Sequence, residues 1–444
     1  MALQLPPVFT TLQVPLIMLT NITALAIGPR HRVLQFAFSV PVLIVLVAQS
    51  LYREWDGGWG LHYGLNCFVM SLVMDWVDWV LLNSPYREGW TKLEVRKGAV
   101  KEEGGVVRKE QGNGYASSNG NLKSNGHASN GHASNGHASN GHAKSNGHAT
   151  SMSKDDAPKR FWSRFWWATR LTTTNRYPGW SCESKNVPVE VGPEYSRLLF
   201  IARKTLRAGL FYALRDVVYS FTASSPHGTW LDIAHIDPVV SFDQYPFLYR
   251  LKYTWVYIVL TYVSVEFANT LYGIASVATG LAVPMDCPSM FGDLKELYSV
   301  RRAWSLVWHQ GVRRVCSAPG IYLARDVLQL SKGSFASKYL QLFVAFCMSA
   351  FMHSAASMLC HASLNDDQAM QVFVYQAVII FVEDHLIDFG KKCGLRDSVF
   401  WRLVGFCWVV LVVGASFESW TGRLLSHGLW VHDRESDFFG IGPK

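Results

Sequence analysis

Long apolar runs, separated by short polar segments, occupy most of the chain. Residues 1–28 carry no charged side chain, and residues 33–52 form an uncharged run of about the 20 residues that a bilayer requires. A third run covers residues 62–82. Because the first run lacks the positive start and the small-residue cleavage site of a secretory signal, we expect it to be retained as a membrane helix. These runs predict N-terminal transmembrane helices over residues 1–84.

Apolar runs return in the C-terminal half of the chain. Four of them cover residues 253–285, 339–363, 369–389 and 400–420. Residues 198–222 are also apolar but contain five charged side chains, so this stretch either crosses the membrane or lies at its interface. The pattern predicts an all-α, polytopic membrane bundle of six to eight transmembrane helices. Its membrane core is expected over residues 160–444.

A polar insert interrupts this pattern over residues 98–159. Its centre repeats a Ser-Asn-Gly-His-Ala unit, which brings five histidines at positions 127, 132, 137, 142 and 148. Such a composition buries too little apolar surface to offset the entropy of ordering, so a disordered linker is predicted. Histidine-rich tracts can bind metal, but nothing fixes the geometry of these side chains, and we favour a passive linker.

The composition supports membrane residence. Hydrophobic residues make up 49% of the chain and charged residues 17%, whereas a soluble chain carries about a quarter of charged residues. The net charge of +8 fits either an excess of Lys and Arg in cytosolic loops or attraction of an anionic co-substrate such as coenzyme A. No basic run accompanies an ordered soluble fold, so nucleic acid is not an expected partner. The eight cysteines form no CxxC pair, which argues against a zinc or redox motif.

Basic residues also predict an orientation. Arg30 and Arg32 lie in the first loop, and a basic cluster over residues 87–97 follows the third apolar run. Positively charged loops favour the cytosolic side of a membrane. Both clusters would be cytosolic if the N-terminus is lumenal.

The first candidate for chemistry is the segment 298–314, YSVRRAWSLVWHQGVRR. On a helix, its apolar side would carry Trp304 and Trp308. Its charge comes from four arginines, Arg301, Arg302, Arg313 and Arg314. This pattern is typical of an amphipathic helix anchored at the membrane interface. An interface anchor does not account for the WHQ triplet, so His309 is equally a candidate functional residue.

The second candidate is His353, which lies in the uncharged segment FVAFCMSAFMHS over residues 343–354. An ionisable residue at membrane depth is costly and usually faces a cavity or a partner. The alternative is a histidine satisfied by a hydrogen bond to a neighbouring helix. Small residues around it leave room either for close helix packing or for a ligand.

Carboxylates inside the apolar runs support a different class of function. Glu383 and Asp384 end the run QAVIIFVEDHLID, and we favour a structural role for them. Asp75, Asp78 and Glu266 are intramembrane carboxylates, which proton-coupled transporters use. No GxSxG elbow, phosphate loop or HExxH motif occurs, so the enzyme classes that these motifs mark are not favoured.

Four blocks carry a resemblance to a known family. They are TTTNRYPGWSCESKNVP (172–188), PSMFGDLKELYSVRRAWSLVWHQGVRR (288–314), FCMSAFMHS (346–354) and QAVIIFVED (376–384). In order and approximate spacing, from Trp162 to the C-terminal runs, the chain resembles the wax-synthase-like branch of the membrane-bound O-acyltransferases. It looks closest to fungal members that acetylate terpenoid and other secondary-metabolite alcohols. One departure is Ala303 before Trp304, where the family usually has Phe-Trp.

The resemblance implies an activity and a set of residues. His353 would be the catalytic histidine, and His309 would take the position of a second polar residue near the acyl donor. Trp304 and Trp308 would border the acyl pocket. The donor would be acetyl-CoA acting as a co-substrate, with no tightly bound cofactor and no metal, and the acceptor a hydrophobic alcohol. The endoplasmic reticulum membrane is the expected location.

A direct transfer fits these residues. Neutral His353 would take the proton of the alcohol while its oxygen attacks the thioester, and His309 would stabilise the developing charge. The four arginines of the 298–314 segment would either meet the phosphates of coenzyme A or anchor the segment at the interface. Two alternatives remain at this point: a long-chain wax or sterol ester synthase, and a proton-coupled transporter. The acceptor alcohol and the oligomeric state stay open.

Overall fold

The computed structural model describes residues 7–53, 55, 57–92, 160–184, 186–233, 240–361 and 365–444. The Ser-Asn-Gly-His-Ala insert lies outside the described residues, so the linker predicted there stays a prediction. The described chain is almost entirely helical, which confirms the predicted all-α class. The longer helices are α1 (Pro7–Ile27), α2 (Arg32–Ala48), α3 (Trp59–Trp76), α5 (Phe161–Thr172), α6 (Arg197–Ala223), α7 (Phe247–Ala278), α9 (Arg313–Tyr322), α10 (Phe335–His361), α11 (Ala369–Lys392) and α12 (Val399–Ser426).

Short elements connect these helices. The single-turn helices are α4 (Ser84–Arg87) and α8 (Val300–Arg302), and the strands are β1 (Gly228–Trp230) and β2 (Trp430–His432). The two strands pair in parallel, with Gly228 opposite Trp430. Three wider π-helical turns extend α3, α8 and α9, at Val77–Leu81, Ala303–Val307 and Leu323–Val327. The remaining turns are 3₁₀, at Pro29–His31, Gln49–Leu51, Phe242–Gln244, Pro284–Asp286, Leu294–Glu296 and Arg434–Ser436.

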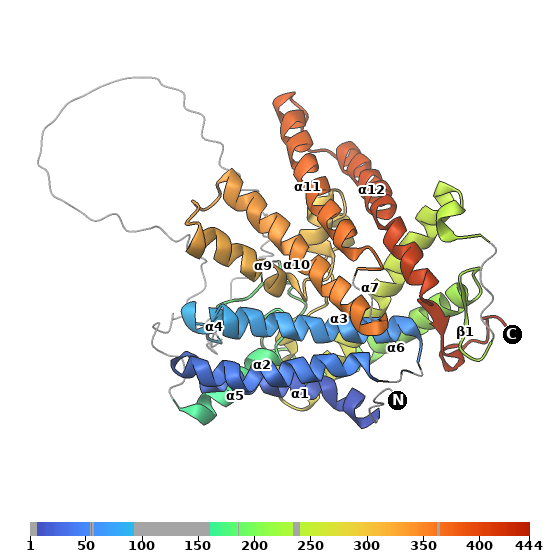
Figure 1. The fold of residues 1–444 in the computed structure, drawn as a ribbon. Helices are drawn as coiled ribbons and strands as arrows, with labels where there is room; N and C mark the ends of the chain where they lie inside the picture. The colour runs from blue at the N-terminus through green and yellow to red at the C-terminus, as the bar shows by residue number, and fades with distance from the viewer. Residues whose placement is uncertain are drawn as a thin grey trace, which may run out of the picture. The chain divides into compact units, whose positions relative to one another are not determined.

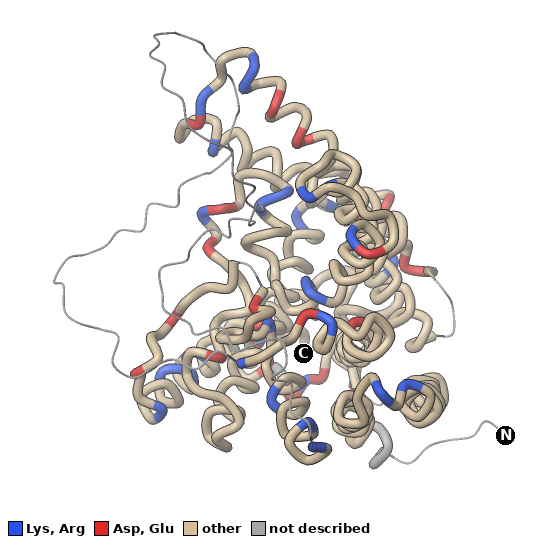
Figure 2. The backbone as a smooth tube through the Cα atoms, turned by 90° about the vertical axis from the view of Figure 1, so that its left-hand side faces the viewer, with Lys and Arg blue, Asp and Glu red and all other residues tan. Residues whose placement is uncertain are grey.

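Among the described residues, five helical stretches are long and apolar enough to cross a membrane: Pro29–Leu51, Trp59–Leu81, Phe247–Ala278, Phe335–His361 and Val399–Ser426. A shorter apolar stretch, Thr11–Ile27, belongs to α1. Five of the predicted six to eight spans thus satisfy both length and composition among the described residues, which agrees with a polytopic bundle. Long parts of these helices carry no charged residue (Figure 2).

Helix α10 lies at the centre of the site region. It packs against α3, α9 and α11, while α7 packs against α6 and α12 (Figure 1). The N-terminal helices α1, α2 and α3 pack on one another, and α5 packs on α1. Buried aromatic residues fill the space between α7, α10, α11 and α12, among them Tyr257, Phe373 and Trp420. This aromatic core surrounds His353.

Two of the three intramembrane carboxylates, Asp78 and Glu266, form ion pairs. Asp78 is fully buried and accepts hydrogen bonds from Arg314 at 2.9 and 3.2 Å. Glu266 is fully buried and pairs with Arg207 at 2.8 Å. A buried charge is tolerated when it is paired and hydrogen-bonded. Asp78 and Glu266 therefore hold helices together, which is a structural use of the residues that had motivated the transporter alternative.

Candidate active site

A cavity of about 290 Å³ lies between α7, α10, α11, α12 and the segment that joins α8 to α9. Its wall is mainly apolar and aromatic. Six predicted site residues line it: Trp304, Trp308, His309, His353, Arg301 and Arg313. A mostly apolar cavity with a few convergent polar groups is the usual form of a small-molecule site.

Aromatic rings hold His353 from two sides. The imidazole stacks on Phe373 with ring centroids 4.5 Å apart and planes 6° apart, and Trp420 meets it edge-on at 5.3 Å. Its Nδ1 lies 2.9 Å from the hydroxyl of Tyr63 on α3 and 3.5 Å from the Cys67 sulfur. His353 lines the cavity, whereas Tyr63 and Cys67 do not. The ring orientation is therefore fixed by packing and by a partner outside the cavity.

His309 occupies a break between helices. The chain leaves α8 through the π turn Ala303–Val307, closed by a hydrogen bond from the Trp308 nitrogen to the Ala303 oxygen at 2.7 Å. The side-chain nitrogen of Gln310 then donates to the Trp304 and Trp308 carbonyls at 3.0 and 2.6 Å. The continuous amphipathic helix expected over 298–314 is thus wrong. The WHQ triplet forms a turn in which Gln310 satisfies carbonyls at the end of the helix.

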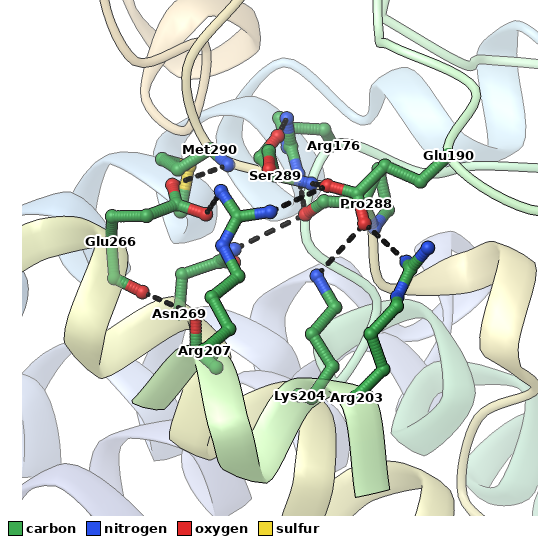
Figure 3. Close-up of polar contacts among 11 residues, drawn as sticks. Arg176, Glu190, Arg203, Lys204, Arg207, Glu266, Asn269, Pro288, Ser289 and Met290 are labelled. Atoms are coloured by element: carbon green, nitrogen blue, oxygen red, sulfur yellow. Dashed lines mark hydrogen bonds and ion pairs between the residues drawn. The ribbon is translucent and has the colours of Figure 1, made fainter. Parts of the chain in front are cut away.

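A polar network holds residues 288–290 beside α6 and α7 (Figure 3). The Met290 carbonyl in turn accepts from the backbone nitrogen of Gln310 at 3.4 Å. Arg176 donates to the Ser289 and Pro288 carbonyls at 2.5 and 2.8 Å, and Glu266 accepts from the Met290 nitrogen at 2.9 Å. Glu190 accepts from the Ser289 nitrogen at 2.6 Å. The Arg176 segment and the PSMFG segment, two of the resemblance blocks, therefore meet directly.

The same network affects His309. Burial of the imidazole, together with the guanidinium of Arg176, lowers the pKa of His309 to about 4. The ring is consequently neutral at physiological pH and offers one N–H donor and one acceptor nitrogen. Phe291 and Trp308 meet the ring at centroid distances of 5.8 and 5.5 Å.

The four predicted arginines divide into two pairs. Arg301 and Arg313 line the cavity. Arg302 pairs with Glu296, and Arg314 pairs with Asp78 and Glu88, and neither is part of the cavity wall.

Arg301 is held by Asp384 through two hydrogen bonds of 2.6 Å. Lys338 and Tyr339 contact the same carboxylate at 2.6 and 2.9 Å. Glu383 accepts from the backbone nitrogens of Val300 and Arg301 at 2.7 and 2.9 Å, and so caps the start of α8. Both carboxylates therefore serve structure, as favoured from the sequence.

Several side chains in the site were not predicted. Gln376 accepts from the Trp304 indole at 3.2 Å and donates to Ser416 at 2.8 Å, which fixes the cavity wall. A fully buried Gln within an apolar run was a detectable signal. Tyr63, Phe373 and Trp420 gave no such signal, because aromatic residues are frequent throughout the chain.

Cysteines do not offer a suitable nucleophile. Cys316 lines the cavity, but burial raises the pKa of its thiol to about 12, so it stays protonated. Cys67 lies beside His353 on the side away from the cavity. A covalent acyl-enzyme through either thiol is therefore disfavoured.

One set of metal-ligating groups is present among the described residues. His361, Asp366 and His427 offer ligand atoms within 4.8 Å of one another. The two imidazoles stack with centroids 4.4 Å apart and planes 18° apart, so their in-plane lone pairs do not converge on one point. His427 instead hydrogen-bonds Asp366 at 2.7 Å. The arrangement is that of a stacked, hydrogen-bonded cluster.

The fold and the cavity together define an integral membrane protein in which two histidines line a mainly apolar cavity. Residues 287–375 match the model of the membrane bound O-acyl transferase family. An acetyltransferase of Leptosphaeria maculans, sirH, is 42% identical over 98% of this chain and 96% of its own length. The chain therefore belongs to the membrane bound O-acyl transferase family, and it is an acyltransferase.

Two further relatives carry the same description. The acetyltransferase ple2 of Rhodocybe pseudopiperita is 32% identical over 59% of this chain and 67% of its own length. The acetyltransferase eriL of Hericium erinaceus is 27% identical over 60% of this chain and 68% of its own length. No solved structure shows significant similarity to the chain.

Proposed function

We propose that this enzyme transfers the acetyl group of acetyl-CoA to a hydroxyl of a hydrophobic secondary metabolite, a terpenoid or meroterpenoid, in the endoplasmic reticulum membrane. The donor is supported by the names of the relatives, three of which are acetyltransferases. The acceptor class is supported by the family resemblance and by the aromatic cavity wall. One observation carries the proposal: His353 and His309, from separate segments, line one apolar cavity.

His353 acts as the general base in this proposal. Its Nε2 takes the proton of the acceptor hydroxyl while the oxygen attacks the thioester carbonyl carbon. The carbon–sulfur bond then breaks, and the thiolate of coenzyme A receives the proton back from His353. Positioned proton transfer of this kind contributes roughly 10²–10⁴-fold to the rate.

His309 supplies a hydrogen bond in the same reaction. Since its pKa of about 4 keeps the ring neutral, it donates from N–H to the thioester oxygen as negative charge develops there. A neutral donor in a dry cavity stabilises the oxyanion without adding a fixed charge to the resting site. Trp304 and Trp308 enclose the acyl group.

The phosphates of coenzyme A meet Arg301 and Arg313 in this proposal, because these two arginines line the cavity. Arginine recognises phosphate oxygens through its planar fork of donors. Arg302 and Arg314 do not line the cavity, and each pairs with a carboxylate. The proposal therefore gives these two arginines a structural role.

The size of the cavity favours a short acyl group. A volume of about 290 Å³ is just below the roughly 300–1,000 Å³ of ligand sites. A cavity of this size accommodates an acetyl group more readily than a sixteen-carbon chain. A long-chain ester synthase is the second candidate, and the length of the donor separates the two.

The test is a comparison of donors and of metabolites. Purified enzyme in detergent is expected to consume acetyl-CoA in preference to palmitoyl-CoA when hydrophobic alcohols are supplied. Mass spectrometry of a deletion strain should show an unacetylated alcohol whose acetate returns on complementation. A clear preference for palmitoyl-CoA would contradict the proposed donor. A metabolite profile unchanged by the deletion would contradict the proposed acceptor class.

A further inference from the structure

We propose that Tyr63, on the N-terminal helix α3, is a positioning residue for His353. The Tyr63 hydroxyl accepts a hydrogen bond from Nδ1, which leaves Nε2 as the proton acceptor on the cavity side. The inference rests on the proposed function, since it gives Tyr63 a role through the general base. Tyr63 lies far outside the residues 287–375 that match the family model.

The geometry assigns the two ring nitrogens to different sides. The Tyr63 oxygen lies 2.9 Å from Nδ1 of His353. Tyr63 is 5% exposed and does not line the cavity, whereas His353 does. Nδ1 therefore faces α3. Nε2, on the other side of the ring, is the nitrogen that remains for a substrate in the cavity.

The proposal also assigns the tautomer of His353. A neutral imidazole carries one proton, and a base at Nε2 requires that proton on Nδ1. Nδ1 faces the Tyr63 hydroxyl at 2.9 Å, which can donate or accept, and the Cys67 sulfur at 3.5 Å, which is a poor donor. The proposal therefore takes the Tyr63 oxygen as the acceptor, because this is the arrangement that leaves Nε2 free to act as the base.

The same bond strengthens during the reaction. When Nε2 receives the proton of the alcohol, the ring becomes an imidazolium, and the Nδ1 hydrogen bond to Tyr63 becomes charge-assisted. An interaction that is stronger in the transition state than in the ground state raises kcat. An interaction of packing alone would not have this effect.

Both rings are held without the hydroxyl. Tyr63 stacks on Trp59 with centroids 5.1 Å apart, and His353 stacks on Phe373 at 4.5 Å. Tyr63→Phe keeps the ring and its packing and removes the acceptor oxygen. The substitution therefore separates the hydrogen bond from the packing.

Tyr63→Phe is expected to lower kcat roughly 10- to 100-fold, as expected for loss of one hydrogen bond to a charged group. The KM values for acetyl-CoA and for the acceptor should stay at the wild-type values, because Tyr63 does not line the cavity. The Tm in detergent should stay close to that of the wild type. Steady-state kinetics of the purified full-length enzyme give the kcat and KM values.

Tyr86→Phe is the matched control. The Tyr86 hydroxyl donates to the Leu25 carbonyl at 2.6 Å, so this variant also removes a tyrosine hydrogen bond among the N-terminal helices, away from the cavity. It should keep the wild-type kcat. An equal fall of kcat in both variants, or a fall that follows loss of thermal stability, would overturn the positioning role.

His353→Ala separates the two proposals. If it is inactive while Tyr63→Phe keeps the wild-type kcat, the positioning role is wrong and the general base stands. If His353→Ala keeps full activity, the proposed function itself is wrong, whatever the result for Tyr63→Phe. Tyr63→Phe added to His353→Ala should cause no further loss, because the hydroxyl acts through the imidazole.

Discussion

Two histidines line the same cavity, but different neighbours surround their rings. His353 is stacked on Phe373 and has a hydroxyl at Nδ1, which suits a ring that must present one nitrogen in a fixed direction. Burial, and secondly the guanidinium of Arg176, lowers the pKa of His309 and so disfavours its protonated form. The neighbours thus distinguish a candidate base from a neutral hydrogen-bond donor.

The low pKa of His309 predicts a pH dependence of stability. In the folded protein the ring stays neutral down to a pKa of about 4, whereas in the unfolded chain it binds a proton below about 6.5. The unfolded state therefore gains protons first, and stability falls as the pH drops from about 6.5 towards 4. His309→Gln should reduce the fall of Tm between pH 7.5 and pH 5.0.

The measurement is thermal unfolding of both proteins in detergent. His432, whose pKa is lowered to about 3 mainly by burial, remains in the variant and should preserve part of the effect. An identical fall of Tm in wild type and variant would show that His309 does not contribute to the pH dependence.

Among the elements, the turn between α8 and α9 depends on a glycine. A Cβ on Gly292 would lie 2.0 Å from the Leu306 oxygen, so any side chain must displace the π turn that precedes Trp308 and His309. We expect Gly292→Ala to lower kcat by about 10²-fold, as a displacement of about 1 Å near reacting groups can do. Kinetics of the purified variant test this.

Gly209→Ala on α6 is the control for that substitution. Its Cβ would meet nothing within 4 Å, and alanine favours a helix by roughly 0.5–1 kcal/mol over glycine. It should keep wild-type activity. Equal activity of both alanine variants would contradict the assigned role of Gly292.

We predict that helix α6 crosses the membrane despite its charged residues. Two of its charged residues are buried, Lys204 and Asp216 at 1% and 2% exposed, while Leu198 and Leu206 are 81% and 78% exposed. Leu206→Arg should sharply lower the yield of folded protein from membranes, since an arginine near a helix centre costs about 2.5–3.5 kcal/mol in a bilayer.

Leu294→Arg is the control, because Leu294 is 58% exposed in a 3₁₀ turn outside the candidate spans. It should be tolerated. A normal yield of Leu206→Arg would mean that this face of α6 contacts water.

The sequence predicted where helices form better than it predicted where they break. Apolar runs of membrane length gave the helical bundle, because bilayer thickness fixes how long such runs must be. The break at Trp308 was missed, since the residues of 298–314 also fit a continuous amphipathic helix. The helix ends where the Gln310 side chain donates hydrogen bonds to the Trp304 and Trp308 carbonyls. The periodicity of the sequence does not reveal these bonds.

At the scale of the whole molecule, the candidate site combines parts that are distant in sequence. The resemblance named His353, His309 and the two tryptophans, and all four line one cavity. Tyr63 lies on α3, which precedes the polar insert in the sequence, and contacts His353 on α10. Its contact with α10 depends on how helices pack, which a single sequence does not encode in local patterns.

The account also relates the membrane to the chemistry. The cavity wall is apolar, the thiols beside it are not activated, and the ion pairs that were candidates for proton coupling hold helices together. In the proposed reaction, an apolar cavity that keeps water away protects the thioester from hydrolysis while an alcohol attacks it. The central claim is that His353 activates that alcohol.

The most direct measurement is the rate of ester formation by purified His353→Ala, with acetyl-CoA and the acceptor identified from the deletion strain. His385→Ala, an exposed histidine on α11, is the control. We predict a loss of roughly 10²–10⁴-fold for His353→Ala at an unchanged Tm, and a wild-type rate for His385→Ala. A correctly folded His353→Ala enzyme that forms the ester at the wild-type rate would contradict the account.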